Sequence, residues 1–323
     1  MKSAVPLKPM LTYSDQIKHL RDKHGLIIES ESFAEEILAS VGYYRLSGYG
    51  IGMIDTKTDR YISNFSFNKL HSIYLFDSQL RNLLSGIIET VEIEFRVKIA
   101  YRLASQYGPA GYLDDCNFNN HISRFSNKRY YDQFIDSLNN EVAKQSSRPI
   151  VIHHNSKYGG QFPIWVAVEL ISFGTLSTLY SSMSSDDQKA IAKHYSTDYS
   201  YVRSWFASLV ELRNICAHYG RLYDYQLKSL PKLPKRFAQY NGSHRLFPIL
   251  ISLCYILRGR NDVTDFIRKL DELISRYDMI ELSSIGFPEN WCEVLNAASA
   301  IMIPNKKDGN TDKQLNKSDD NHS

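Results

Sequence analysis

The amino-acid sequence predicts an all-α fold. Apolar residues recur at helical spacing through most of the 323 residues, and no region is rich in the alternating pattern of β-strands. The chain is 43% hydrophobic and 23% charged, which suits a globular protein with a large core. We therefore expect helices joined by loops, in one elaborate domain or two smaller ones.

Residues 1–65 are expected to form an N-terminal helical region. Ser14 suits the start of a first helix and Gly25 its end, and a second helix ends near Gly42. The segment DRYISNFSF, residues 59–67, is compatible with a β-hairpin or a loop, and we interpret it as a linker.

The main helical domain is expected over residues 66–304, and it begins with a long helix. Between residues 70 and 106 the sequence has no proline, and apolar residues follow a helical period. This pattern predicts one long helix or two nearly continuous ones. A connection over 107–127, a helix over about 128–144 and a proline-containing break over 146–163 are expected to follow.

The rest of the chain is expected to be helical up to its tail. Pro163 suits a helix start, and the apolar run after it predicts a single helix to about Met183. Acidic residues follow Ser185, as they should at a helix N-terminus. Further helices are expected over about 200–219, 246–257 and 263–276. Residues 305–323 contain one leucine and no other large apolar residue, so we expect a disordered tail.

The sequence argues against several classes of protein. Its four cysteines are widely spaced without a CxxC pair, which indicates neither a disulfide framework nor a zinc site, and we expect no metal and no cofactor. The chain has no apolar run of the roughly 20 residues that a membrane span needs, and no signal peptide, so we expect a cytoplasmic protein. A phosphate-binding GxxxxGK loop, typical of NTPases, is also missing.

The segment ELRNICAHYGR, residues 211–221, carries the candidate catalytic residues. On an ideal helix, an apolar seam forms from Trp205, Leu209, Leu212 and Cys216. The opposite side carries Glu211, Asn214, His218 and Arg221. Asn214 and His218 are four residues apart and share a face, while Arg213 lies on the flank with a long stem that can bend towards them.

These residue types suit the cleavage of RNA without a metal. The arginine can clamp a phosphate through two hydrogen bonds and stabilise its developing charge. The histidine can take a proton from the ribose 2′-hydroxyl or give one to the leaving 5′-oxygen. The asparagine can orient either the histidine or the phosphate. We therefore identify Arg213, Asn214 and His218 as the candidate catalytic residues.

The spacing of arginine and histidine does not by itself establish a site. In a chain with 10 histidines it arises by chance about once or twice, and Arg148 precedes His153 and His154 at such spacings. Pro149 and the β-branched residues after it argue against a helical presentation of that second copy. For Arg213 and His218 the alternative is a polar face near a helix C-terminus, where cations are favourable.

Basic residues gather after the candidate motif. Between residues 213 and 260, nine lysines and arginines stand against one acid, Asp224, and such an excess attracts a polyanion. The candidate RNA-binding residues are Arg221, Lys228, Lys232, Lys235 and Arg236, together with Arg45 and Lys157. Arg45 lies in GYYRLSGY, residues 42–49, which either binds RNA through stacking tyrosines or forms a packed connection between helices.

Charged residues on the apolar helices need partners. Asp77, Arg81, Glu92, Glu94 and Arg96 on the long helix indicate either an internal salt-bridge network or a solvated face. Glu169 lies in the otherwise apolar segment PIWVAVELISFG. A buried carboxylate requires a partner, so this residue either pairs with a core arginine or supports the active site.

Four blocks of sequence carry a resemblance to a known family. The blocks are GYYRLSGYG (42–50), residues 75–104, residues 153–183 and LRNICAHYGRLYD (212–224). In this order they resemble the Abi-like abortive-infection family of bacterial phage-defence proteins, of the AbiD and AbiF type, over about residues 10–260. The resemblance implies a HEPN-like helical bundle with an N-terminal helical extension and additional C-terminal helices. Its active-site motif, an arginine followed four to six residues later by a histidine, falls on Arg213 and His218.

The resemblance also implies a function. It predicts a metal-independent endoribonuclease that leaves a 2′,3′-cyclic phosphate and acts in abortive infection or as the toxin of a toxin–antitoxin system, in association with a noncoding RNA. HEPN ribonucleases usually bring two motifs together, and the chain offers one credible copy, so we expect a homodimer. The alternative is a non-catalytic RNA-binding HEPN-like module or sensor that uses the basic segment 213–260.

Overall fold

The structure is a computed structural model that describes residues 9–123 and 126–300. Helices predominate in these ranges, which confirms the predicted all-α fold. The expected disordered tail, 305–323, lies outside the described residues. None of the described helices combines the length and the apolar character that a membrane span requires.

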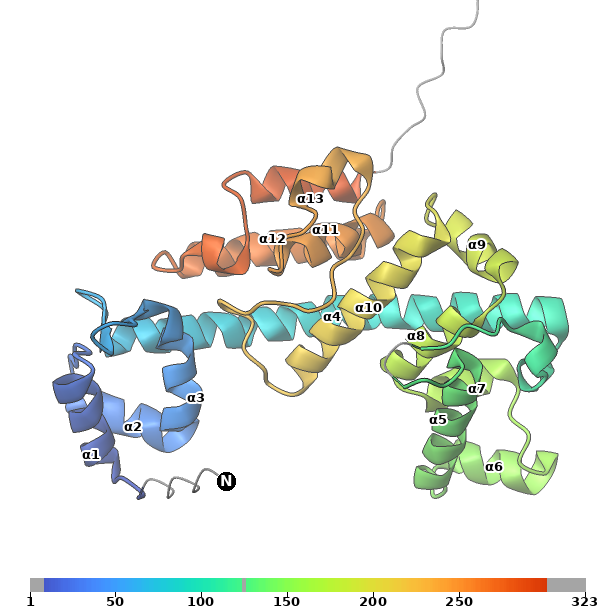
Figure 1. The fold of residues 1–323 in the computed structure, drawn as a ribbon, viewed down its shortest axis with the longest axis horizontal. Helices are drawn as coiled ribbons and strands as arrows, with labels where there is room; N and C mark the ends of the chain where they lie inside the picture. Colours follow the sequence, from blue (N-terminus) through green and yellow to red (C-terminus); the bar gives the residue numbers. More distant parts are fainter. Residues whose placement is uncertain (1–8, 124–125, 301–323) are drawn as a thin grey trace, which may run out of the picture.

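The long helix α4, Phe67–Tyr107, forms an axis along which the other helices are arranged, and several of them pack directly on it (Figure 1). The sequence predicted one or two helices here, and the chain forms one of 41 residues. Ser66 caps its start, where the side-chain oxygen accepts a hydrogen bond of 3.2 Å from the Lys69 N–H. Gly108 ends it with a positive φ of 79°, a conformation that glycine adopts without strain.

The N-terminal elements lie at one end of α4 (Figure 1). They are α1 (Tyr13–Lys18), a π-helical turn (His19–Lys23), α2 (Glu31–Val41), α3 (Tyr43–Ser47), a 3-10 turn (Gly48–Met53) and a hairpin of β1 (Ile54–Asp55) and β2 (Arg60–Tyr61). The segment interpreted as a linker therefore contains the second strand of a short antiparallel hairpin. The division into domains near residue 65 stays a prediction.

The opposite end of α4 carries the next helices (Figure 1). They are α5 (Tyr130–Lys144), α6 (Pro149–Tyr158), α7 (Ile164–Leu170), α8 (Phe173–Ser182) and α9 (Ser185–Lys193), with 3-10 turns at Gly111–Leu113 and Asp115–Asn117. The predicted break over 146–163 is wrong, because Pro149 occupies the first turn of a helix, where its missing N–H costs nothing. His153 and His154 are consequently helical, contrary to expectation.

The single helix predicted after Pro163 is divided into α7 and α8. Ile171 and Ser172 between them are extended, and the Ser172 side-chain oxygen begins α8 by accepting a hydrogen bond of 3.1 Å from the Thr175 N–H. Arg96 on α4 donates hydrogen bonds to the carbonyl oxygens of Val168 and Ile171. The break is therefore stabilised from both sides, by a local cap and by an arginine distant in sequence.

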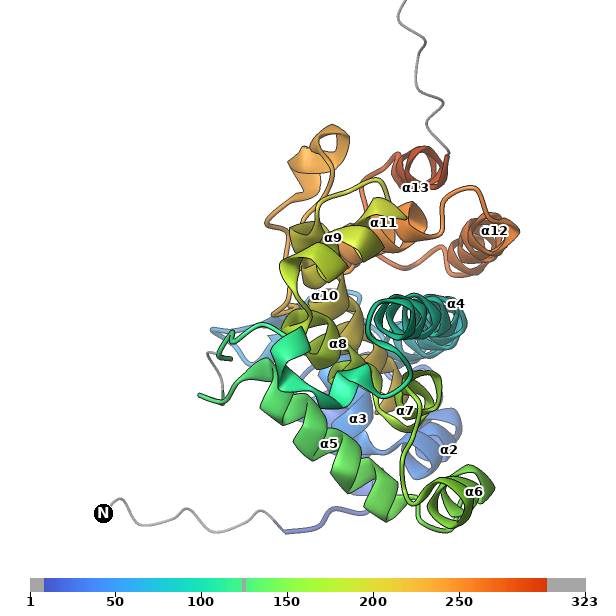
Figure 2. The same cartoon turned by 90° about the vertical axis from the view of Figure 1, so that its right-hand side faces the viewer.

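The last helices cover α4 from a different direction. They are α10 (Tyr199–Ala217), α11 (Phe247–Ile256), α12 (Asn261–Arg276) and α13 (Trp291–Ser299), with 3-10 turns at Lys235–Tyr240 and Leu282–Ile285. Figure 1 and Figure 2 show α11–α13 on one side of α4 and α5–α7 on the opposite side. The sequence predicted α11 and α12 but not α13. Helix α10 packs against α4, α8 and α9.

A buried carboxylate joins the N-terminal region, α4 and the chain after α10. Asp77 is fully buried and forms an ion pair with Arg81, one turn further along α4. It accepts hydrogen bonds from the Tyr49 hydroxyl (2.8 Å) and from the backbone N–H groups of Leu222 (3.1 Å) and Tyr223 (2.8 Å). These donors come from different parts of the chain, so the carboxylate holds three segments in one arrangement.

We expect Asp77→Ala to lower the free energy of unfolding by about 3–5 kcal/mol, because it leaves the Arg81 guanidinium buried without a counter-charge. Urea denaturation followed by circular dichroism measures this loss. The control is Asp186→Ala, since the Asp186 side chain is 85% exposed in its ion pair with Lys189 and should contribute at most about 0.5 kcal/mol. Equal, small losses in the two variants would contradict the proposed role of Asp77.

Candidate active site

The C-terminal end of α10 presents the candidate catalytic residues to solvent. The predicted seam of Trp205, Leu209, Leu212 and Cys216 is buried, and Asn214 and His218 are exposed. The backbone N–H of His218 donates a hydrogen bond of 3.0 Å to the carbonyl oxygen of Asn214, so the two residues remain one helical turn apart. The prediction that they share a face is confirmed. Burial raises the pKa of the Cys216 thiol to about 12, which leaves it protonated and unsuited to act as a nucleophile.

The helix ends in a turn that reverses the chain directly after His218. The Gly220 N–H bonds to the Ile215 carbonyl oxygen (2.8 Å) and the Tyr219 N–H to that of Cys216 (3.3 Å), which is the Schellman pattern of helix C-termini. The position that glycine usually occupies in this motif is taken by Tyr219, with a φ of 56°. The turn directs the following residues back towards α4, where Asp77 binds their N–H groups.

Arg213 lies on the flank of α10 and reaches α4. Its Nε atom is 3.7 Å from a carboxylate oxygen of Glu92, and its side chain remains 40% exposed. Glu92 also pairs with Arg96, the residue that binds the carbonyl groups at the α7–α8 break. A carboxylate of the long helix therefore orients the candidate phosphate-binding arginine. The sequence pointed to Glu92 as part of a salt-bridge network and did not indicate this role.

The salt-bridge network predicted along α4 is confirmed. Besides the pairs of Asp77 with Arg81 and of Glu92 with Arg96, Glu94 pairs with Arg260 at 2.7 Å. Within each of the first two pairs the residues are four positions apart, so they lie on neighbouring turns of one face. This face of α4 lies against the end of α10 and the turn after it, because Arg213 contacts Glu92 and the Leu222 N–H binds Asp77.

Two of the candidate RNA-binding arginines support the turn. Arg221 was expected on the same helical face as Asn214 and His218, but α10 ends before it, and its guanidinium donates to the Gly48 carbonyl oxygen. Arg45 Nη1 donates to the Tyr219 carbonyl oxygen at 2.9 Å. Glu211 was expected on that face too, and its carboxylate accepts hydrogen bonds from the backbone N–H groups after the turn.

The two tyrosines Tyr44 and Tyr49 of the segment GYYRLSGY fit different interpretations, RNA binding and a packed connection between helices. Tyr49 is buried and bonded to Asp77, and its burial, together with that negative charge, raises its pKa. This residue fits the packed connection between helices. Tyr44 is 93% exposed and fits a surface that meets a ligand.

The basic segment after the turn runs beside α10. Its candidate residues Lys228, Lys232, Lys235 and Arg236 are all exposed. The Lys228 N–H bonds to the Glu211 carboxylate at 2.9 Å, and the Lys232 N–H bonds to the Ser204 hydroxyl at 2.9 Å. The exposed basic residues are therefore arranged along α10, from Lys228 near its C-terminal end to Lys232 near its N-terminal half.

Comparison with known protein families identifies the chain. A family model described as Abi-like protein matches residues 36–224, more than half of the sequence. The chain belongs to the Abi-like family. Among curated proteins and solved structures, nothing matches the chain. Family membership supports a role for this Abi-like protein in abortive infection.

The matched region of the Abi-like protein contains the candidate site and the residues of α4 that contact it. It begins within α2 and ends at Asp224, beyond the turn that Asp77 holds. It includes α4, the α7–α8 break and all of α10. The hairpin of the N-terminal region also falls within it, whereas α11–α13 follow it.

Of two further residues predicted to act at the site of the Abi-like protein, one lies elsewhere and the other does not form the predicted ion pair. Lys157 is exposed on α6, and Figure 1 shows α6 at the opposite end of the fold from α3, which contacts the turn after His218. Glu169 is exposed on α7, so the expectation that it pairs with a core arginine is wrong. Arg96 pairs instead with Glu92. A supporting role for Glu169 stays a prediction.

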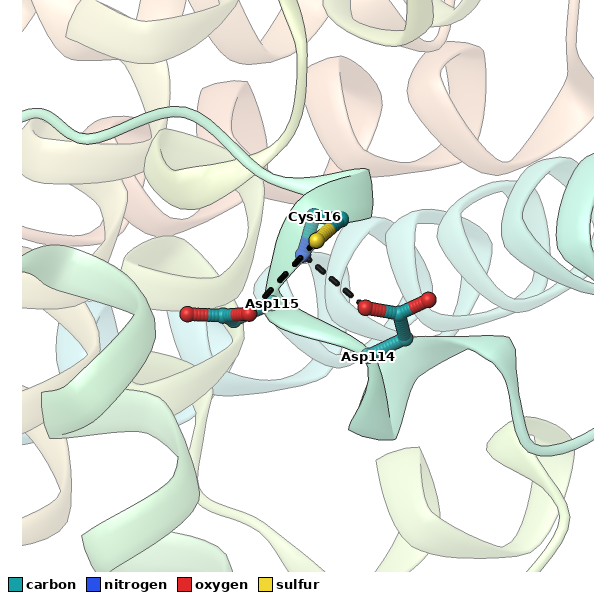
Figure 3. A group of neighbouring side chains, drawn as sticks. All are labelled: Asp114, Asp115 and Cys116. Carbon is teal, nitrogen blue, oxygen red and sulfur yellow. Dashed lines mark hydrogen bonds between the residues drawn. The ribbon is translucent and has the colours of Figure 1, made fainter.

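One group of side chains near the C-terminal end of α4 has metal-ligand character. Figure 3 shows Asp114 and Asp115, whose exposed carboxylates lie on opposite sides of Cys116. Asp114 accepts a hydrogen bond of 3.1 Å from the Cys116 N–H, and Asp115 pairs with Arg129 at 3.2 Å. Hydrogen bonding to Asp114 and the charges of both carboxylates raise the pKa of the thiol. These contacts describe a capped turn with a protonated cysteine.

Proposed function

We propose that this Abi-like protein is a metal-independent endoribonuclease of the HEPN type, which acts in the cytoplasm in phage defence by abortive infection or as the toxin of a toxin–antitoxin system. The observation that carries the proposal is the arrangement at the end of α10. Asn214 and His218 are exposed one turn apart, and Arg213, which precedes Asn214 on the same helix, contacts Glu92 of α4. Substrate RNA and a restraining noncoding RNA are the proposed partners.

The chemistry follows from these three side chains. The terminal nitrogens of Arg213 bind the scissile phosphate in the proposed complex and stabilise the charge that develops on it. His218 accepts the proton of the ribose 2′-hydroxyl, whose oxygen attacks the phosphorus while the bond to the 5′-oxygen breaks. The products are a 2′,3′-cyclic phosphate and a 5′-hydroxyl. Asn214 orients the histidine or the phosphate.

A second copy of the chain completes the proposed site. The reaction requires a base for the 2′-hydroxyl and an acid for the leaving 5′-oxygen, and one histidine cannot act as both in a single step. The other arginine and histidine at suitable spacing are Arg148, which is the N-cap residue of α6, and His153 on α6, and this helix lies away from α3 and the turn (Figure 1). A homodimer provides the second histidine.

An apolar surface next to Glu92 is the proposed contact between the two copies. Ile93, Val97 and Tyr101 follow α4 at four-residue spacing and are 53%, 60% and 76% exposed. Trp165 on α7 is also exposed and lines a hollow of about 530 Å³ together with Val97 and Tyr101. Ile93 follows Glu92 directly on α4, so one end of this surface lies at the same level of the helix as the carboxylate that contacts Arg213, on a face about 100° away.

The alternative function is a non-catalytic RNA-binding module or sensor. The exposed basic segment beside α10 favours it, because Glu211 and Ser204 hold the backbone of this segment in place for a polyanion. The two functions differ in whether RNA is cut, and they share the binding surface.

We expect His218→Ala and Arg213→Ala each to lower the rate of RNA cleavage by at least about 100-fold, because they remove the proton-transfer group and the phosphate clamp. Arg213→Lys should also cleave slowly, since lysine lacks the two-pronged geometry. Cleavage of labelled RNA in EDTA is the measurement.

The matched control for these variants is Arg268→Ala, which removes an arginine with a 56% exposed side chain on α12 and should leave the cleavage rate unchanged. The nuclease proposal fails if the Arg213 and His218 variants retain both cleavage and toxicity in cells. RNA binding by the wild-type chain without cleavage identifies the binding module instead.

We expect the triple variant Lys228→Ala, Lys232→Ala, Lys235→Ala to bind RNA more weakly and with less dependence on salt. For single-stranded RNA, the logarithmic slope should fall by about 0.7 for each phosphate that the variant no longer neutralises. Fluorescence anisotropy at several salt concentrations measures this slope. The control removes three lysines of similar exposure on α1, α9 and α12, namely Lys18, Lys189 and Lys269. Identical slopes in the two triple variants would rule out the basic segment as the RNA-binding surface.

We expect the variant Val97→Glu, Tyr101→Glu to be monomeric in analytical ultracentrifugation and to lose RNA cleavage although His218 is intact. Two carboxylates in the proposed contact would have to be buried without partners. Ile152→Glu is the control, because Ile152 is 53% exposed on α6 and its replacement should leave the dimer intact. A wild-type monomer that cuts RNA at the full rate would refute the dimer.

A further inference from the structure

A hollow of about 260 Å³ lies beside the turn that follows His218. One wall comes from α3 and the 3-10 turn after it, with Tyr44, Arg45 and Ile51. The other wall comes from the turn after α10, with Tyr219 and Arg221. The two walls belong to the two segments that the Asp77 carboxylate binds to α4. One lining residue, Tyr219, directly follows the candidate catalytic His218 in sequence.

Three side chains that line this hollow expose large apolar surfaces to solvent. Tyr44 is 93% exposed and Tyr219 is 69% exposed, and Ile51 is 60% exposed. Single exposed apolar residues are ordinary on a protein surface. Three of them around one hollow form a site at which a planar apolar group can bind.

The backbone of Tyr219 adds an independent observation. This residue occupies the left-handed position of the Schellman turn with a φ of 56°, where glycine is favoured and a bulky side chain is strained. Arg45 binds its carbonyl oxygen (2.9 Å), and Arg81 binds that of Gly220 (3.2 Å), so the turn is held in this conformation. Strain of this kind is concentrated at functional sites. An exposed aromatic side chain in a position better suited to glycine does not serve packing.

The charges at the hollow suit a phosphate. Within the described part of the chain, Arg45 and Arg221 each use a single terminal nitrogen in a hydrogen bond to a carbonyl oxygen. A guanidinium has five N–H donors, so both residues retain donors for an anion. Aromatic faces for a base beside arginines for its phosphate are the features with which proteins bind single-stranded RNA.

We propose that this hollow binds the nucleotide next to the scissile phosphate of the RNA substrate. Its base stacks on Tyr44 or Tyr219, and Arg45 and Arg221 contact its phosphates. This inference rests on the proposed ribonuclease function, since the position of Tyr219 directly after His218 places the bound nucleotide beside the cleaved bond. The hollow therefore contributes to the choice of the base at the cleavage position.

The experiment measures RNA binding separately from cleavage. In a His218→Ala background, the affinity for a labelled single-stranded RNA is measured by fluorescence anisotropy after Tyr44→Ala or Tyr219→Gly. We expect each change to weaken binding by about tenfold, the effect of losing one stacked base. Glycine accepts the left-handed conformation, so Tyr219→Gly should keep or raise the melting temperature while it loses affinity.

Matched variants separate stacking from folding. Tyr44→Phe and Tyr219→Phe retain the ring and should retain affinity, and Tyr13→Ala, which removes a 44% exposed tyrosine from α1, should have no effect. With His218 intact, the Tyr44 and Tyr219 variants should also change the base preference at the mapped cleavage positions.

The outcomes distinguish this inference from the proposed function. Folded Tyr44→Ala and Tyr219→Gly variants with wild-type affinity would overturn the nucleotide site, even if the wild-type chain cuts RNA. If the wild-type chain cuts no RNA but both variants bind RNA more weakly than it does, the nuclease would be overturned, and the hollow would remain a site for an RNA nucleotide without a role in cleavage.

Discussion

The carboxylate of Asp77 is the constraint on which the candidate site depends. A buried carboxylate is unfavourable unless charges and hydrogen-bond donors replace the lost water, and here those donors come from three segments of the chain. Arg81 provides the counter-charge, Tyr49 a hydroxyl, and the chain after α10 its N–H groups. The turn that follows His218 can therefore take only the course that brings these N–H groups to α4. The exposed end of α10 is oriented by an interaction that is itself fully buried.

A second ion pair on α4, about four turns further along, also connects this helix to other elements. Glu92 and Arg96 form a pair on α4, and each also contacts another element: Glu92 contacts Arg213 on α10, and Arg96 contacts the carbonyl groups at the α7–α8 break. Because α4 is one uninterrupted helix, the distance between the two pairs is set by its regular rise. The position of Arg213 relative to the turn after His218 thus follows from the geometry of a single helix.

The features that the sequence predicted have a local cause, whereas features that depend on distant partners were not predicted. Helix α6, with Pro149 in its first turn, is a local feature that was missed. The length of α4 and the two faces of α10 follow from a helical period within neighbouring residues. The α7–α8 break depends in part on Arg96, far away in sequence, and the course of the chain at Arg221 depends on a tyrosine that adopts a conformation typical of glycine. Arg213 and His218 were chosen from their spacing and a family resemblance. The contact of Arg213 with Glu92 required the tertiary structure.

The pair of Arg213 and Glu92 has a consequence for any anion that approaches the end of α10. It is a single contact of 3.7 Å between a 40% exposed guanidinium and a 13% exposed carboxylate that also pairs with Arg96. A phosphate that binds the guanidinium through two charged hydrogen bonds interacts more strongly than that. Glu92 therefore gives the arginine a resting position that restricts its motion in the free protein and is relinquished at little cost. The Arg213 side chain is thus oriented in the free protein, and its ion pair with Glu92 competes only weakly with an anionic ligand.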